Sequence, residues 1–96
     1  MNRTRADISE SISKGTGIPI KEVRVVLESF IEEVKDVFYK NDRIELRGFG
    51  VFENNFRKGK IGRNPRTMEE VKIPDRWVPT YKPSRRLRKE IENKNF

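Results

Sequence analysis

Residues 20–39 carry an apolar stripe that the rest of this short chain cannot cover. Apolar residues recur there at spacings of three, four and seven positions, and Lys, Glu and Asp occupy much of the remaining helical surface. The segment before it offers only Ile8 and Ile12 on one face. We therefore expect a helix from Pro19 to about Tyr39 that packs against a second chain. On this helix the expected dimer core consists of Val23, Leu27, Phe30, Ile31, Val34 and Phe38.

The composition indicates either partial disorder or a core that is shared between chains, and the apolar stripe of the long helix favours the shared core. Only 33% of the 96 residues are apolar and 39% are charged, so a single small domain of this kind has a marginal core of its own. The chain has no Cys and no His, which excludes disulfides, zinc sites built from these residues and catalysis by a Ser–His or Cys–His pair. We expect no metal, no cofactor and no enzymatic activity.

Neither a membrane span nor a signal peptide is predicted from the sequence. No apolar run approaches the roughly 20 residues that cross a bilayer. The first residues also lack the apolar centre of a secretion signal. The expected location is therefore the cytoplasm.

The positive charge is concentrated in the second half of the chain. Residues 1–48 contain nine Lys/Arg and nine Asp/Glu, whereas residues 49–96 contain thirteen and six, so the whole net charge of +7 arises from the second half. Such asymmetry indicates a polyanionic partner such as nucleic acid. Charge alone is not specific, because a generic basic protein has the same balance.

The first half of the chain predicts two helices followed by a strand. Thr4 suits the cap of a first helix, with Asp7 three residues later, and the run from Gly15 to Gly17 ends it. Pro19 suits the first turn of the second helix, which extends to about Tyr39. After a turn at residues 40–42, Ile44 and Leu46 alternate with charged residues as in a half-buried strand.

The second half predicts a basic two-stranded ribbon between a sheet and a last helix. A second strand follows Gly48-Phe49-Gly50 and extends to Phe56. Residues 54–68 contain no acid, and Asn64-Pro65 is a turn signal before a strand pattern resumes at Val71 and Ile73. Residues 77–81 indicate a short edge strand after Pro74 ends the pairing, and Ser84 suits the cap of a last helix with Leu87 and Ile91 on its buried face.

Several motifs, in this order, resemble the HU/IHF family of bacterial DNA-binding proteins. They are Gly48-Phe49-Gly50-x-Phe52, Gly62-Arg63-Asn64-Pro65-x-Thr67, Ile73-Pro74 and Tyr81-Lys82-Pro83. The resemblance covers essentially the whole chain. Its most specific part is Gly-Arg-Asn-Pro at residues 62–65, which in the family is the tip of a β-ribbon arm. The start and the tail are most similar to the alpha-type chains of integration host factor.

The resemblance implies an α+β fold and an intertwined dimer. A helix–turn–helix body (residues 1–41) would carry the dimer contacts, joined by Phe49 and Phe52. A three-stranded antiparallel sheet (42–82) would extend into a β-ribbon arm (about 54–73), and a short helix (83–96) would end this single DNA-binding domain. The partner would be double-stranded DNA, held largely by backbone contacts and shape, and the protein would organise the nucleoid.

The resemblance also implies which residues meet DNA. Minor-groove architectural proteins, of which this family is the standard example, insert an apolar wedge between base pairs and kink the duplex. Pro65 would be that wedge, Arg63, Asn64 and Arg66 would face the groove, and basic residues along the arm and the last helix would hold phosphates. The expected DNA contacts are Thr4, Arg47, Gly48, Arg57, Lys58, Lys60, Arg63, Asn64, Pro65, Arg66, Lys72, Arg76, Lys82, Ser84, Arg85, Arg86 and Lys89.

The sequence departs from the family pattern at two positions. Met68 stands where the arm turn usually has Gly, and a positive φ there would carry a steric cost. In an alternative role, Met68 would add an apolar contact in the groove. Ser84 replaces a Gly that is common before the last helix, and it is an acceptable helix cap.

Three other functions compete with an HU-like homodimer. An IHF-like subunit would need a different partner chain and would prefer certain sites through the deformability of the DNA. A basic RNA-binding protein would have the same charge, but the aromatic stacking motifs of RNA-recognition domains are missing. An enzyme would need a pocket with a nucleophile and a base, and nothing here forms one.

Overall fold

A computed structural model describes all of residues 1–96. The chain divides into two compact units, Met1–Asp36 and Val37–Phe96, and each is described by itself. The first unit contains α1 (Arg5–Thr16) and most of α2 (Ile20–Tyr39) and no strand. The second unit contains the last turn of α2, which begins in the first unit, together with all the strands and a terminal helix. No helix is long and apolar enough to cross a bilayer.

Helix α1 spans Arg5–Thr16, and its sequence determines both of its ends. Thr4 and Asp7 form a capping box, in which the Thr4 amide and hydroxyl donate to the Asp7 carboxylate at 3.0 Å each. These hydrogen bonds hold the pKa of Asp7 below its ordinary value. At the other end, Gly17 adopts φ 76° and its N–H donates to the Ser13 carbonyl, so the predicted glycine stop is confirmed.

Helix α2 spans Ile20–Tyr39 and confirms the long helix that the apolar spacing predicts. Pro19 precedes the helix rather than lying in its first turn, and its carbonyl accepts hydrogen bonds from Glu22 and Val23. Proline is suited to this position for the same reason as to the first turn: it has no N–H, so it leaves no donor unpaired before the helix. The turn after α2 contains Asn41 at φ 55°, a residue type that tolerates this conformation.

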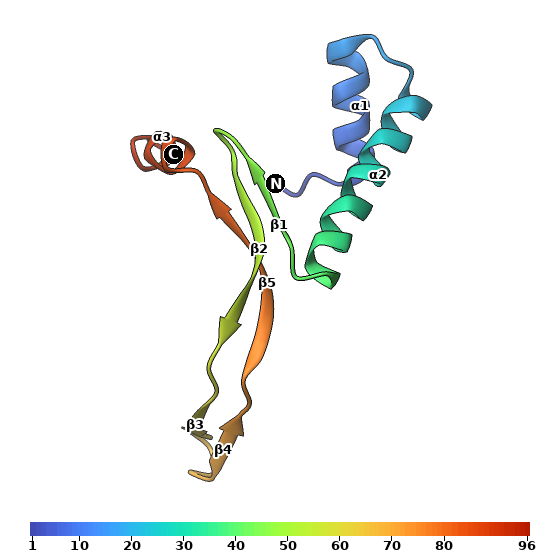
Figure 1. The fold of residues 1–96 in the computed structure, drawn as a ribbon. Coiled ribbons are helices and arrows are strands. Elements are labelled where there is room, and N and C mark those ends of the chain that lie inside the picture. Colours follow the sequence, from blue (N-terminus) through green and yellow to red (C-terminus); the bar gives the residue numbers. More distant parts are fainter. The chain divides into compact units, whose positions relative to one another are not determined.

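Strands β1 (Arg43–Leu46), β2 (Gly50–Arg57) and β5 (Arg76–Pro83) form an antiparallel sheet with β2 in the centre. β1 pairs with β2 only as far as Glu53, whereas β5 pairs with β2 along its whole length, from Gly50 opposite Pro83 to Arg57 opposite Arg76. Strand β5 is therefore longer than the predicted edge strand 77–81. Beyond Glu53, β2 and β5 continue as a two-stranded ribbon (Figure 1).

Strands β3 (Lys60–Arg63) and β4 (Glu70–Ile73) form the far end of this ribbon (Figure 1). Pro74 does end β4, as predicted, but strand pairing resumes two residues later at Arg76. Residues 58–59 and 74–75 therefore interrupt the ladder on both strands at the same level. We call the ribbon of residues 54–79 the arm and this interruption its joint.

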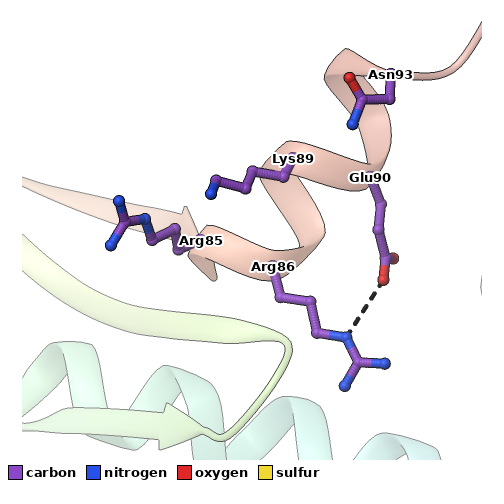
Figure 2. A pocket seen from close by; sticks show the side chains of 5 residues that line it. All are labelled: Arg85, Arg86, Lys89, Glu90 and Asn93. Atoms are coloured by element: carbon purple, nitrogen blue, oxygen red, sulfur yellow. Dashed lines mark hydrogen bonds and ion pairs between the residues drawn. The ribbon is translucent and has the colours of Figure 1, made fainter.

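Helix α3 spans Arg85–Glu92 after Ser84, which is the predicted cap. The Ser84 hydroxyl accepts from the Leu87 N–H at 3.1 Å and donates to the Gly48 carbonyl at 3.0 Å. The Ser84 N–H donates to the Phe49 carbonyl, which also accepts from the Tyr81 hydroxyl. Ser84 thus attaches α3 to the β1–β2 turn. Arg85 and Lys89 extend to the same side of the helix, while Arg86 reaches Glu90 (Figure 2).

The single chain buries almost none of its apolar side chains. Val23, at 5% exposure, is the only buried hydrophobic residue. Among the other residues of the expected dimer core, Phe30 and Phe49 are exposed, and Leu27, Ile31, Val34, Phe38 and Phe52 are half-buried. An apolar hollow of about 300 Å³ in the first unit is lined by Ile12, Ile18, Val23, Val26, Leu27 and Phe30. A chain with so little core of its own needs a partner surface to fold.

Candidate nucleic-acid interface

The arm tip is a tight turn that presents Pro65 to solvent. Asn64 organises it: its N–H donates to the Glu69 carbonyl at 2.9 Å, and its carbonyl accepts from the Met68 N–H at 2.7 Å. The Asn64 side chain also accepts from the Arg66 N–H at 2.9 Å. Pro65 lacks an N–H and is exposed, so the turn presents an apolar ring without an unpaired donor.

Met68 adopts φ 60°, in the left-handed region that favours glycine. A side chain in the left-handed region is strained, by about 1–2 kcal/mol per residue for most L-amino acids. The Met68 side chain is 62% exposed, so burial within the chain does not offset this cost. The sequence makes a steric cost at Met68 conditional on a positive φ, and the structure meets that condition.

Replacing Met68 by Gly should order the arm tip. We expect slower amide exchange at Asn64 and Met68, whose N–H groups close the turn, because the substitution removes the strain at positive φ. Hydrogen exchange followed by NMR on the free protein would measure this. Thr67→Gly is the control, because Thr67 has no positive φ; Gly there loosens the chain and removes the hydroxyl that accepts from the Glu69 N–H at 3.4 Å, so exchange should become faster. Faster exchange in Met68→Gly would contradict the strain.

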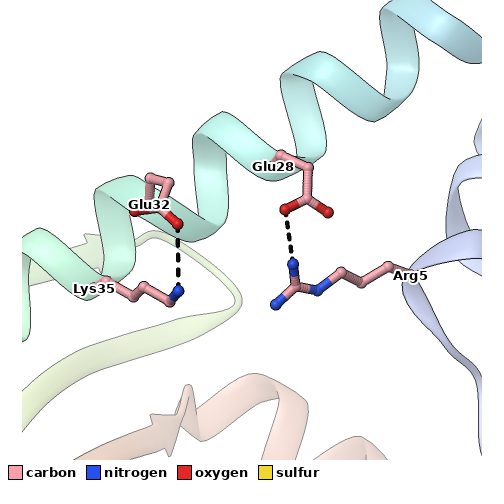
Figure 3. A network of polar contacts seen from close by, with 4 residues as sticks. All are labelled: Arg5, Glu28, Glu32 and Lys35. Carbon is pink, nitrogen blue, oxygen red and sulfur yellow. Dashed lines mark hydrogen bonds and ion pairs between the residues drawn. The ribbon is translucent and has the colours of Figure 1, made fainter.

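The basic residues of the arm have no acidic partner, in contrast to many basic residues of the helices. In the first unit, Arg5 pairs with Glu28 at 2.7 Å and Lys35 with Glu32 at 3.3 Å (Figure 3). Lys14 likewise pairs with Glu10 at 3.0 Å. No such ion pair forms in the arm, although acids lie close by in sequence at residues 69, 70 and 75. The exposed arm cations without an ion pair are Arg57, Lys58, Lys60, Arg63, Arg66, Lys72 and Arg76.

Two of these cations lie directly opposite each other, Arg57 on β2 and Arg76 on β5. Like charges in one cross-strand pair destabilise a ladder. They line a hollow of about 480 Å³, and no acidic residue contributes to its lining. Its other lining residues are Asn55, Phe56, Lys58, Lys60 and Ile73. An anion bound between the guanidinium groups would remove the repulsion, so this geometry is suited to a phosphate.

The joint of the arm was not foreseen from the sequence. The Gly59 N–H donates to the Asp75 carboxylate at 2.5 Å, which links the two strands where the backbone ladder is interrupted. A Cβ on Gly59 would meet the Ile73 carbonyl oxygen and lie 2.8 Å from the Asp75 nitrogen. Gly59 and Asp75 therefore shape the arm between its base and its tip. Only the acid beside Pro74, in a strongly basic segment, could have signalled this.

The basic residues expected to hold phosphates along the flank of a bent duplex differ in whether they form ion pairs within the chain. Arg85 and Lys89 have no ion pair, whereas Arg86 pairs with Glu90 at 3.3 Å. Together with Glu90 and Asn93 they line a hollow of about 630 Å³ on α3 (Figure 2). Lys82 pairs with Glu53 at 3.0 Å, so a phosphate would compete with that carboxylate.

The remaining expected contacts lie at turns and helix starts. Arg47 and Gly48 form the β1–β2 turn, with Gly48 at φ 82° and Arg47 exposed. The donors of Thr4 already serve the Asp7 carboxylate, and the hydroxyl of Ser84 serves the β1–β2 turn. A phosphate at either helix start would compete with these partners.

A model of the family described as bacterial DNA-binding proteins matches residues 3–92. The chain belongs to this family, which comprises the HU and IHF proteins. HU/IHF proteins are DNA-binding architectural proteins rather than enzymes, and they form dimers. The family resemblance and the α+β fold that the sequence indicates are therefore confirmed.

HU/IHF relatives match along nearly the full length of the chain. Integration host factor subunit alpha of Hydrogenovibrio crunogenus is 42% identical over 93 residues, 97% of this chain and 96% of the relative. Integration host factor subunit beta of Marinobacter nauticus is 36% identical over 91 residues, 94% and 93% of the two chains. HU of Anabaena, solved in a cocrystal with DNA, has a TM-score of 0.82 and 28% identity, covering 98% of this chain and 100% of that one.

Proposed function

We propose that this HU/IHF protein bends double-stranded DNA from the minor-groove side. Two arms, one from each subunit of a dimer, enter the groove, and Pro65 of each inserts between base pairs. The observation that carries this proposal is the arm itself: exposed cations without acidic partners lead to a tip that presents an apolar ring. The minor groove attracts arginine by its negative potential, and an apolar wedge unstacks a base step there.

Phosphate contacts would supply most of the affinity. Arg57 and Arg76 would share one phosphate at the arm base, and Lys58, Lys60 and Lys72 would follow the backbone toward the tip. Arg63, Asn64 and Arg66 would face the groove beside Pro65. Arg85 and Lys89 would hold phosphates along the flank of the bent duplex, joined by Arg47 and Gly48. Thr4, Lys82, Ser84 and Arg86 remain proposed contacts that must give up a partner within the chain.

We expect Pro65→Ala to bind DNA but to bend it less. A duplex of roughly 35 base pairs with a donor and an acceptor dye at its ends would report the bend by energy transfer. Losing the wedge removes kinks on the order of 20–90° each, while the phosphate contacts stay. Pro65→Ile is the matched control, since it keeps an apolar wedge and should bend nearly as the wild type. Binding by the wild type without a change in transfer would contradict the proposal.

For the assembly, we propose a homodimer located in the nucleoid. A heterodimer with a related chain is the alternative, and the similarity to both the alpha and the beta subunits of integration host factor favours considering it. Purification of the chain alone decides between them. A stable dimer that saturates the duplex supports the homodimer, whereas a chain that bends DNA only when a second family chain is added supports the heterodimer.

A further inference from the structure

A row of aromatic side chains follows one face of β2 and β5 from the sheet into the arm. Phe52 lies opposite Tyr81 and Phe56 lies opposite Trp77, two pairs further along the same face. Phe49 joins at the near end, with its ring centroid 5.1 Å from that of Tyr81. Phe56 and Trp77 meet edge to face at 5.4 Å. We call these five residues the aromatic row.

The far end of the aromatic row is open in the single chain. Phe56 is 53% exposed and Trp77 is 58% exposed, although each ring packs against the other. Phe49 and Tyr81 are also exposed. Since an aromatic side chain buries about 150–250 Å² when covered, the row leaves on the order of 500 Å² without a partner. That is a large part of the roughly 800 Å² that each partner contributes to a stable interface.

The opposite face of the same strands has a different chemistry. The next cross-strand pair beyond Phe56 and Trp77 is Arg57 with Arg76, and alternation along a strand places it on the other side of the ribbon. The arm base thus has one aromatic face and one cationic face. Phe56 also borders the hollow that Arg57 and Arg76 line, but its cross-strand partner Trp77 does not. If phosphates occupy the cationic face, Trp77 points away from them, and DNA does not cover its ring.

We propose that a second copy of this chain covers the aromatic row as far as Phe56 and Trp77, so that the dimer interface reaches the root of the arm. The row includes Phe49 and Phe52, which the proposed dimer core contains, and only the pair Asn54–Pro79 separates these from Phe56 and Trp77 on the same face. The single chain buries only Val23 among its hydrophobic residues, so its folding requires apolar surface from another copy. Covering the root would fix the direction in which the arm leaves the sheet. The inference rests on the proposed dimer, but not on bending.

The only tryptophan of the chain, Trp77, reports this contact directly. We would measure its emission maximum and its quenching by acrylamide in the full-length dimer without DNA, beside free N-acetyltryptophanamide. The proposal expects blue-shifted emission and quenching reduced several-fold relative to the free indole. A quenching constant above half that of free N-acetyltryptophanamide, in a dimer verified by sedimentation, would overturn the proposal. A folded chain that stays monomeric would also overturn it.

A double variant and a control test whether the aromatic face, and not the arm in general, stabilises the dimer. Phe56→Thr with Trp77→Thr keeps β-forming residues in the cross-strand pair but removes the rings. We expect the dissociation constant of the dimer to rise at least about tenfold, as for loss of an anchor at an interface. Asn55→Thr is the matched control on the opposite face of β2, and its dimer should dissociate as the wild type does. An unchanged constant in the double variant would overturn the proposal.

A measurement with DNA distinguishes this inference from the proposal that the protein bends DNA. At protein concentrations that keep both forms dimeric, the double variant should still bend the dye-labelled duplex. If it instead loses DNA affinity there, and DNA quenches Trp77 in the wild type, the aromatic row contacts DNA and the inference fails. Loss of bending in Pro65→Ala does not depend on the aromatic row, so the failure of one proposal leaves the other measurable.

Discussion

Replacing Arg57 and Arg76 together by Gln should lower the affinity for DNA by about 10- to 100-fold near 100 mM salt. It should also reduce the slope of log K against log salt concentration by about 2, because each of the two arms of the homodimer loses one phosphate contact and each contact contributes close to one released counterion. Titrations of a dye-labelled duplex at several salt concentrations would measure both quantities. The loss should be similar for duplexes of different sequence, since contacts to phosphate carry no base information.

The same double substitution should make the free arm more stable. Arg57 and Arg76 are directly opposite in the ladder, and neither has an acidic partner. Removing like charges from one cross-strand pair relieves repulsion. Amide exchange in Asn55–Arg57 and Arg76–Val78 should therefore slow down while DNA affinity falls. Opposite signs for stability and binding would identify the pair as a site that tolerates repulsion in order to bind an anion.

A variant with the same loss of charge elsewhere is the control. Lys14→Gln with Arg24→Gln removes two positive charges from the helices, at positions outside the proposed DNA contacts. If net charge alone governed binding, both double variants would lose affinity equally and with the same salt slope. That result would refute the paired arginines as a phosphate site, because the geometry of the arm would then make no difference.

Local signals in the sequence were sufficient to predict most of the elements. Thr4, Gly17 and Ser84 mark helix ends through hydrogen bonds to neighbours within four residues, and such short-range chemistry is visible in a single sequence. The tip turn follows in the same way from Asn64-Pro65. The sequence alone left the sign of φ at Met68 open, and the family resemblance only indicated the position at which a positive φ would matter; the structure has φ 60° there.

Contacts that depend on strand register could not be predicted. Nothing local places Arg57 opposite Arg76, or Gly59 against Asp75 sixteen residues later in the chain. Likewise, Glu53 accepts from Lys82 only because β2 and β5 pair along their full length. A shift of one residue would move each side chain to the other face of the ribbon. The separation into an aromatic and a cationic face is therefore a property of the register and not of the composition.

Gly50→Ala should be among the most destabilising single substitutions in the second unit. Gly50 is buried where β2 passes β5, and a Cβ there would lie 2.7 Å from Cε1 of Tyr81 and closer still to the Lys82 carbonyl oxygen. The Tyr81 ring cannot easily move aside, because its hydroxyl donates to the Phe49 carbonyl at 2.9 Å and its ring packs on Phe49 and Phe52. We expect a loss of about 3 kcal/mol, the upper part of the range for overpacking.

Gly15→Ala is the matched control, and it should have the opposite sign. Gly15 lies within α1, and a Cβ there would meet nothing within 4 Å. Alanine in a helix is favoured over glycine by about 0.5–1 kcal/mol, so this variant should be more stable than the wild type. Thermal unfolding of both at one fixed protein concentration, as a dimer requires, would compare them. The melting temperature shifts by about 4–8 °C per kcal/mol of stability, so the two variants are easy to tell apart.

The pair of glycine variants also tests the register on which the arm depends. The clash at Gly50 exists only if Gly50 lies opposite Pro83, with Tyr81 and Lys82 alongside, and this pairing sets Arg57 opposite Arg76 further along the same two strands. If Gly50→Ala were as stable as the wild type, β2 and β5 would have to pair in another register. The paired arginines and the aromatic row would then be lost together. A strong loss at Gly50 beside a gain at Gly15 supports the register from which both surfaces follow.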